Sequence, residues 1–148
     1  VTRIPKIETT DLQHRDVDVK TVRRVARAAA EVREGTIDQI SLVFVNNTRI
    51  RQLNRQLLGR DRPTDVIAFE TEKDPDGLAR AEGYISVEQA HKQAQKQGHS
   101  PEYELAFLVA HAVLHMLGFD DSTEAQRRKM FQTQEAIIRQ IEEFDAIE

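Results

Sequence analysis

The sequence contains no cysteine and no tryptophan, and only 5% of its residues are aromatic. Without cysteine there are no disulfide bonds or thiolate metal sites, so a metal ion would have to be held by histidine, aspartate or glutamate. No apolar run approaches the roughly 18 residues that a membrane span needs. The initial stretch, "VTRIPKIETTDLQHRD", has no apolar segment of the signal-peptide type. We therefore expect a cytoplasmic protein with no secretory signal and no membrane partner.

Length and composition favour a single globular domain over residues 1–148, with 39% hydrophobic and 31% charged residues. The net charge of -4 argues against indiscriminate binding of nucleic acid. The positive charge is nevertheless concentrated in one segment of the chain. This cluster comprises Arg49, Arg51, Arg55, Arg60 and Arg62. It is typical of a solvated helix face, and it also suits a local basic patch for nucleic acid.

Hydrophobic periodicity predicts an α+β fold: a small mixed β-sheet packed with about five helices. Helices are expected at about 17–34, 47–57, 87–97, 100–117 and 122–144. Strands are expected at 38–46, 63–71 and 82–88. The alternation of strands and helices is not regular enough for a strictly repeated strand–helix–strand fold.

The segment "HAVLHMLGFDD", residues 111–121, is the clearest candidate for chemistry. His111 and His115 are four residues apart, so a helix projects both imidazoles from one face, which suits a single cation. Gly118 ends the helix and allows the chain to reverse, which can bring Asp120 or Asp121 to the same point. The alternative is a buried apolar helix in which both histidines are ordinary core residues.

The residue after the first histidine narrows the chemistry of such a site. Histidine spacing of this kind overlaps the metzincin protease pattern, in which a glutamate general base follows the first histidine. Here Ala112 stands at that position. A protease of that mechanism would lack its base, so peptidase activity is disfavoured.

Three ordered segments resemble the YbeY family of bacterial metal-dependent single-strand endoribonucleases, which act in ribosomal RNA maturation and ribosome quality control. "HAVLHMLGFDD" resembles the family's His-Gly-x-Leu-His-Leu-x-Gly-Tyr-Asp-His block. "LNRQLLGRDRPTDVIAFE", residues 53–70, resembles Leu-Asn-x-x-Tyr-Arg-x-x-Asp-x-Pro-Thr-Asp-Val-Leu-Ser-Phe. "AEGYIS", residues 81–86, resembles Gly-Asp/Glu-Ile-x-Ile-Ser, with Glu82 in the acidic place.

The chain departs from the family pattern at three positions. Asp121 stands where the family has its third histidine ligand, and carboxylate oxygen is a competent ligand beside two histidines. Leu58 stands at the family's arginine, which Arg60 or Arg55 replaces only if the loop allows it. Ala112 stands in place of glycine, a change that a helix tolerates well.

The resemblance implies one divalent metal ion, zinc before other metals, held by His111, His115 and Asp121. It also implies a single-stranded ribosomal RNA substrate and proteins of the small ribosomal subunit as further partners. Candidates for general base or for a supporting role around the metal are Glu82, Asp65 and Asp120. Each also has a structural explanation: a solvated strand end, a turn cap and a helix cap, respectively.

The basic segment would hold the RNA backbone through phosphate contacts, chiefly from Arg55, Arg60 and Arg62. Two other functions are consistent with the residues. One is a non-catalytic or regulatory metal-binding protein of the ribosome, suggested by Leu58 and Asp121. The other is a metal-dependent hydrolase with a different substrate.

Overall fold

A four-stranded sheet is the centre of the computed structural model, which describes residues 4–35, 37–60, 64–71, 73, 75–77 and 79–147, with side chains to residue 142. The strands are β1 (Lys6–Asp11), β2 (Ile37–Val45), β3 (Val66–Glu70) and β4 (Ala79–Ser86). Their order is β1-β2-β4-β3. β1 and β4 run parallel to β2, whereas β3 is antiparallel to β4, so the sheet is mixed, as expected.

The helices of the described chain are α1 (Val19–Ala30), α2 (Asn47–Leu58), α3 (Val87–Gln97), α4 (Pro101–Met116) and α5 (Glu124–Ile147). The α+β class with about five helices is thereby confirmed. The first helix is shorter than predicted at both ends; its start is set by Asp18, which caps it by accepting a hydrogen bond from the Thr21 backbone N–H. β1 was not predicted: Ile7 is its only buried residue, so the strand has no hydrophobic pattern of its own.

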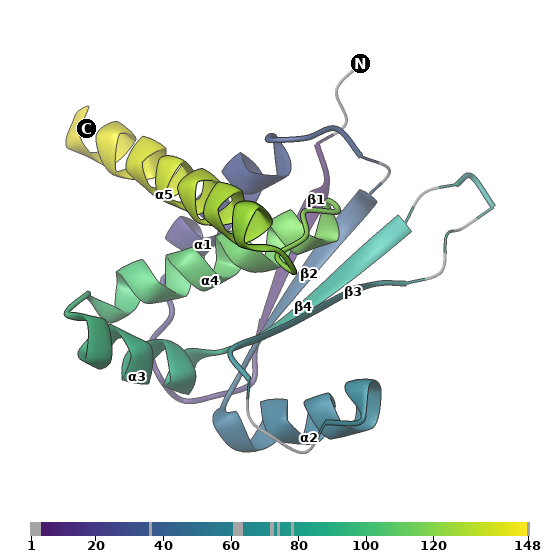
Figure 1. Cartoon of the computed structure of the whole chain (residues 1–148), viewed down its shortest axis with the longest axis horizontal. Helices are drawn as coiled ribbons and strands as arrows, with labels where there is room; N and C mark the ends of the chain where they lie inside the picture. The colour runs from purple at the N-terminus through teal and green to yellow at the C-terminus, as the bar shows by residue number, and fades with distance from the viewer. Residues whose placement is uncertain are drawn as a thin grey trace.

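The two faces of the sheet carry separate hydrophobic clusters. Alternate residues of β2, including Ile40 and Leu42, face the large core formed with α1 and α4. The intervening Val43 faces a smaller cluster with Ile50 and Leu53 of α2. Figure 1 shows α2 on one side of the sheet and α1, α4 and α5 on the other.

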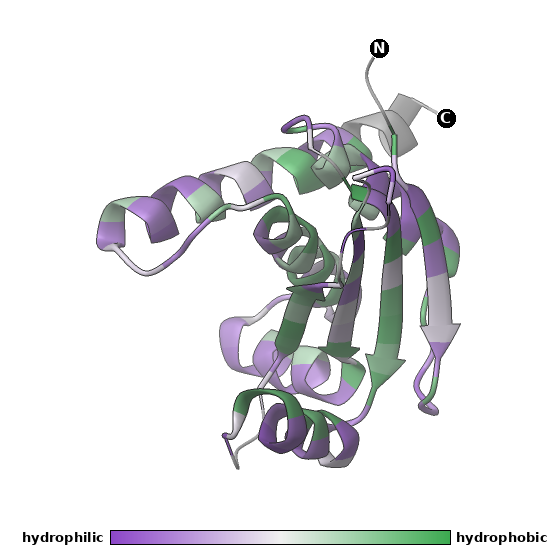
Figure 2. Cartoon of the chain, turned by 90° about the vertical axis from the view of Figure 1, so that its right-hand side faces the viewer, coloured by the Kyte–Doolittle hydropathy of each residue, from purple (hydrophilic) through white to green (hydrophobic). Residues whose placement is uncertain are grey.

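Helix α4 lies between the sheet and α5, and α3 packs beside it. Ten of its sixteen residues are buried. Strands β2 and β3 are largely apolar and β1 is largely polar, whereas α5 mixes polar and apolar residues along its length (Figure 2). Within the described part of the chain, no helix combines the length and the apolar character that crossing a membrane requires.

Candidate metal centre

Helix α4 begins with a well-formed cap and carries both histidines. The Ser100 side chain accepts a hydrogen bond from the Tyr103 backbone N–H at 3.1 Å, and Pro101 occupies the first turn, where its missing N–H costs nothing. The predicted start of this helix is therefore confirmed. His111 and His115 follow near its end, on one face.

A glycine in the sheet allows α4 to approach closely. A Cβ atom on Gly83 of β4 would lie 2.8 Å from Met116 Cε and 3.6 Å from Ala112 Cβ. Ala112 is fully buried against this strand. The small residues at positions 83 and 112 thus bring the helix onto the sheet and fix the height of the histidines above it.

The chain reverses immediately after α4. Gly118 has φ +92°, a backbone conformation that favours glycine, and its N–H donates to the His115 carbonyl at 3.0 Å. Phe119 is buried, and the guanidinium of Arg33 lies 4.0 Å from the centre of its ring. The reversal is therefore fixed by backbone conformation and by burial of the next side chain.

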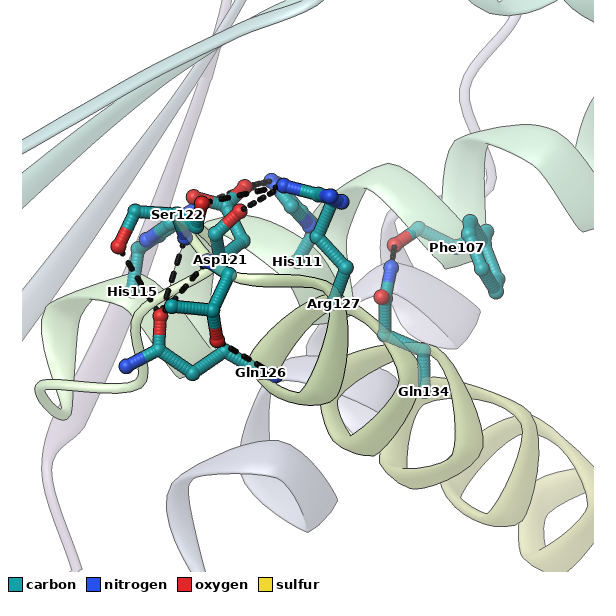
Figure 3. Close-up of polar contacts among 9 residues, drawn as sticks. Phe107, His111, His115, Asp121, Ser122, Gln126, Arg127 and Gln134 are labelled. Atoms are coloured by element: carbon teal, nitrogen blue, oxygen red, sulfur yellow. Dashed lines mark hydrogen bonds and ion pairs between the residues drawn. The ribbon is translucent and has the colours of Figure 1, made fainter.

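The loop that carries Asp121 is held by the first turn of α5. Arg127 Nη1 donates to the carbonyl oxygens of Asp121 and Ser122 at 3.3 and 3.2 Å. Gln126 Oε1 accepts hydrogen bonds from the backbone N–H groups of Ser122 and Thr123 (Figure 3). Two helices and the loop between them therefore position the carboxylate.

Three potential ligand atoms converge at this point. His115 Nε2 lies 3.0 Å from His111 Nε2 and 3.3 Å from Asp121 Oδ2, and His111 Nε2 lies 3.7 Å from the same oxygen. Atoms bonded to one cation at about 2.0–2.2 Å lie about 2.8–3.8 Å apart at bond angles of about 90–120°. The three residues fit a single divalent ion with open coordination positions, and all three are partly exposed.

Burial and charge keep His111 ready to bind a metal. Burial, and then the neighbouring His115, lower its pKa, while Asp65, Asp121 and a hydrogen bond to Gln134 oppose that shift. The neutral imidazole that results is the form that coordinates metals. Gln134 is buried, and its Nε2 donates to the Phe107 carbonyl at 3.0 Å, which leaves its amide oxygen for the imidazole (Figure 3).

Asp65 is the predicted catalytic candidate that the fold brings to this centre. A cavity of about 290 Å³ is lined by Asp65 together with His111 and Asp121. Gln93 Nε2 donates to Asp65 Oδ2 at 3.3 Å, which orients the carboxylate. Asp120 is exposed and lies outside the three-residue group, although it directly precedes Asp121.

Glu82 lies on the opposite side of the sheet from α4. Its neighbour Gly83 faces α4, and adjacent residues of a strand point to opposite faces. The Tyr84 hydroxyl donates to Glu82 Oε2 at 3.1 Å, and Tyr84 packs against the α2 cluster. The structure thus does not bring Glu82 to the metal centre.

The arginines expected to bind RNA are on the α2 side as well. Arg55 lies in the last turn of α2, and Arg60 follows it, with its backbone N–H donating to the Asn54 carbonyl at 3.3 Å. Both are exposed. Arg62 lies outside the described residues. The fold does not place Arg55 or Arg60 in the cavity that contains the ligand atoms.

Comparison with known proteins places the chain in a family. The family described as Endoribonuclease YbeY matches residues 6–142. The chain belongs to the YbeY endoribonuclease family. Proteins named Endoribonuclease YbeY are 41% identical in Bacillus licheniformis, over 75% of this chain and 77% of the relative, and 39% identical in Geobacillus thermodenitrificans, over 81% and 84%. The one from Halalkalibacterium halodurans is 34% identical over 92% of this chain and 93% of the relative.

A solved structure has the same fold. The solution structure of a Thermotoga maritima protein matches with a TM-score of 0.62, covering 95% of this chain and 92% of that one at 23% identity. The α+β architecture built around α4 is thus shared with an experimentally determined structure.

The structure accommodates the three departures from the YbeY pattern. Asp121 reaches both histidines with one oxygen. Ala112 fits because Gly83 opposes it. Leu58, in place of the family's arginine, ends α2 with 53% of its surface exposed. The three ligand residues thus still converge on one point, whereas position 58 carries no charge.

Several residues around the candidate metal centre were not expected from the sequence. On α5 they are Arg127, Met130, Phe131 and Gln134, and on α4 they are Glu104 and Phe107. The spacing of the first set places it on one face of a helix, which is a signal that the sequence contains. This face lies next to the histidines only because α5 packs on α4, a contact that the spacing alone does not predict.

Proposed function

We propose that this YbeY-family protein is a metal-dependent endoribonuclease that cleaves single-stranded RNA in ribosomal RNA maturation and ribosome quality control. The observation that carries the proposal is the open group of His111, His115 and Asp121 at the edge of a cavity. The names of its relatives supply the substrate class. We further propose that the whole of residues 1–148 serves this activity as one cytoplasmic domain.

The ligand side chains determine which metal ion the site favours. We assign it as divalent zinc, because two neutral imidazoles and one carboxylate form a donor set found in catalytic zinc sites. Such an ion polarises a phosphoryl oxygen or lowers the pKa of bound water. His111, with its pKa lowered by burial, stays unprotonated and available to the ion.

Asp65 is our proposed proton acceptor. It lines the same cavity as the ligands, and its hydrogen bond from Gln93 fixes the orientation of the carboxylate. It would accept a proton from the attacking water or from the 2′-hydroxyl of the substrate. Asp120 is the alternative acceptor, whereas Glu82 is assigned no part in the chemistry because it lies on the α2 side of the sheet.

The substrate backbone would be held by phosphate contacts from Arg55 and Arg60, together with Arg62, which lies outside the described residues. These contacts supply affinity without reading the sequence. Proteins of the small ribosomal subunit are the further partners that we propose, since they surround the RNA that a maturation nuclease must reach.

Purified protein incubated with unstructured RNA tests the proposal directly. We expect cleavage that stops when a chelator is added, and about one bound divalent ion per chain by elemental analysis. His115→Ala should lose the ion and at least a hundredfold in cleavage rate, because one of three ligands is removed. Its partly exposed side chain makes retention of the fold expected, which circular dichroism checks.

Two further variants sharpen this test. Asp121→His restores the histidine of the family pattern and should keep the ion, whereas Asp121→Ala should lose it. Asp65→Asn, compared with Asp120→Asn, separates the two proposed proton acceptors. Metal binding without any RNA cleavage would favour the non-catalytic ribosomal role, and cleavage that is unaffected by both chelator and His115→Ala would refute the proposal.

A further inference from the structure

The cavity next to the metal centre continues beyond the ligands. It lies between α4 and α5 and measures about 290 Å³, close to the lower end of the range for small-molecule sites. His111 and Asp121 line one part of it, and residues of α3 line another. A chemical group in this cavity would therefore sit directly beside the reacting phosphate.

Aromatic rings form one wall of the cavity. Phe107 and Phe131 meet edge to face with their ring centres 5.3 Å apart, and Phe131 is 50% exposed although it is large and apolar. Tyr103 stacks on Phe107 at 6.1 Å along the same helix. Rings exposed in this way are the surfaces on which unpaired nucleobases stack, and every base has a π-face suited to them.

The polar wall is rich in hydrogen-bond acceptors. Asp65 and Glu104 contribute carboxylates that are not metal ligands, and Glu104 is only 4% exposed. Arg127 is the one cation that the described residues place there. This balance disfavours a phosphate in the cavity, and it suits an uncharged ring that presents an amino group. The N–H of uracil suits it less, because that donor lies between two carbonyl oxygens that the carboxylates would repel.

A neighbouring groove has the opposite character. It shares Asp65 and Gln93 with the cavity and runs along α3, where Lys92 and Lys96 line it. Ammonium groups on exposed side chains are suited to phosphates along a strand. The two depressions together provide a place for a base and a path for the backbone that leads from it.

From these features, we propose that the cavity between α4 and α5 binds one unpaired nucleobase bearing an exocyclic amino group, next to the scissile phosphate, with the strand continuing past Lys92 and Lys96. The base stacks on the exposed ring of Phe131 and meets the ring of Phe107 edge to face, and its amino group donates to Glu104. In a duplex that edge is occupied by pairing, so the cavity selects single strands. This inference rests on the proposed RNA substrate and specifies how that substrate is held.

Binding of fluorescein-labelled homopolymers tests the inference on the metal-loaded protein. The probes are 2′-O-methyl oligocytidylate, oligoadenylate and oligouridylate, which lack the 2′-hydroxyl nucleophile, and affinity is read by fluorescence anisotropy. We expect the cytidylate and adenylate probes to bind more tightly than the uridylate probe. Phe131→Ala should weaken binding roughly five- to 100-fold, the range for loss of one stacked base.

Two variants serve as controls, and a third tests the contact with Glu104. Phe131→Tyr keeps the ring and should bind like the wild type. Leu12→Ala removes another exposed apolar side chain, 60% exposed and outside the cavity, and should change nothing. Glu104→Gln should reduce the preference for cytidylate over uridylate, because the amide also offers donors to the carbonyl oxygens of uracil.

The outcomes distinguish this inference from the function on which it rests. Equal affinity of the wild type and Phe131→Ala, or equal affinity for the three homopolymers, overturns the base site even if the protein cleaves RNA. Weaker binding by Phe131→Ala, together with a preference of the wild type for cytidylate and adenylate, supports the base site. If unmodified RNA is nevertheless not cleaved, only the proposed catalytic function fails.

Discussion

The two sides of the sheet differ in how they use their helices. On one side α4 buries ten of its sixteen residues and holds the two histidines between the sheet and α5. On the other side α2 buries three of its twelve residues and exposes arginines to solvent. A buried helix is held in place by packing on every side, whereas an exposed one is held along a single stripe.

This difference suits the two tasks that we assign to the two sides. Metal coordination requires ligand atoms held to within a few tenths of an ångström, which the packed surroundings of α4 provide. Phosphate contacts tolerate movement, because their attraction is long-range and non-directional compared with coordination. The variants below test whether the division holds, in order of decreasing expected effect.

Adjacent residues of β4 give the sharpest test, because Gly83 faces α4 and Glu82 faces the α2 side. Gly83→Val places atoms where Met116 now lies, and it should cost about 1–3 kcal/mol of stability and weaken metal binding. Urea unfolding and metal titration measure both effects. Glu82→Gln should leave metal affinity unchanged, and the division between the faces would be wrong if it behaved like the glycine variant.

The arginines of the α2 side give the second test. The double variant Arg55→Ala, Arg60→Ala should reduce RNA affinity about tenfold. It should also lower the salt dependence of binding by about 0.7 in log–log slope for each phosphate that the protein no longer neutralises. Metal content should not change. The double variant Lys92→Ala, Lys96→Ala is the matched comparison on the α3 groove. If only the lysine pair alters the slope, the RNA path lies entirely on the α4 side.

Substitution of the buried Glu104 should have the smallest effect of the three tests, on the pH dependence of stability. Burial raises its pKa above the ordinary 4.5, so the folded protein holds this proton more tightly than the unfolded chain. Stability from this group is therefore present at low pH and declines as pH rises through and above 4.5. Glu104→Gln should flatten that decline and stabilise the protein at neutral pH, because the amide carries no charge whose burial is unfavourable. Urea midpoints measured across pH provide the check, and an unchanged pH profile would contradict it.

Much of the fold followed from local patterns. The helices expected at about 47–57, 87–97 and 100–117 are found at Asn47–Leu58, Val87–Gln97 and Pro101–Met116. β1 escaped prediction because it becomes a strand only by pairing in parallel with β2, a contact distant in sequence. Its own residues are too polar to indicate burial.

The candidate site, too, was predictable where it depends on local sequence and not where it depends on distant contacts. The spacing of His111 and His115 and the reversal at Gly118 predicted that an aspartate would reach the histidines, and the close approach of Asp121 is confirmed. The choice of Asp121 over Asp120 came from the family resemblance. Whether these atoms bind zinc stays a prediction.

The sequence by itself therefore determined the relations that lie within one or two helical turns. These are the shared helix face of the two histidines, the end of the helix after them and the chemistry of the ligand side chains. Backbone hydrogen bonding imposes these relations on any chain that forms the helix. Only the tertiary structure decided that Asp65 joins the metal centre, that Glu82 does not, and that α5 brings Phe131 and Gln134 to α4. Those relations depend on which hydrophobic faces bury one another, and that is settled by the packing of the whole chain.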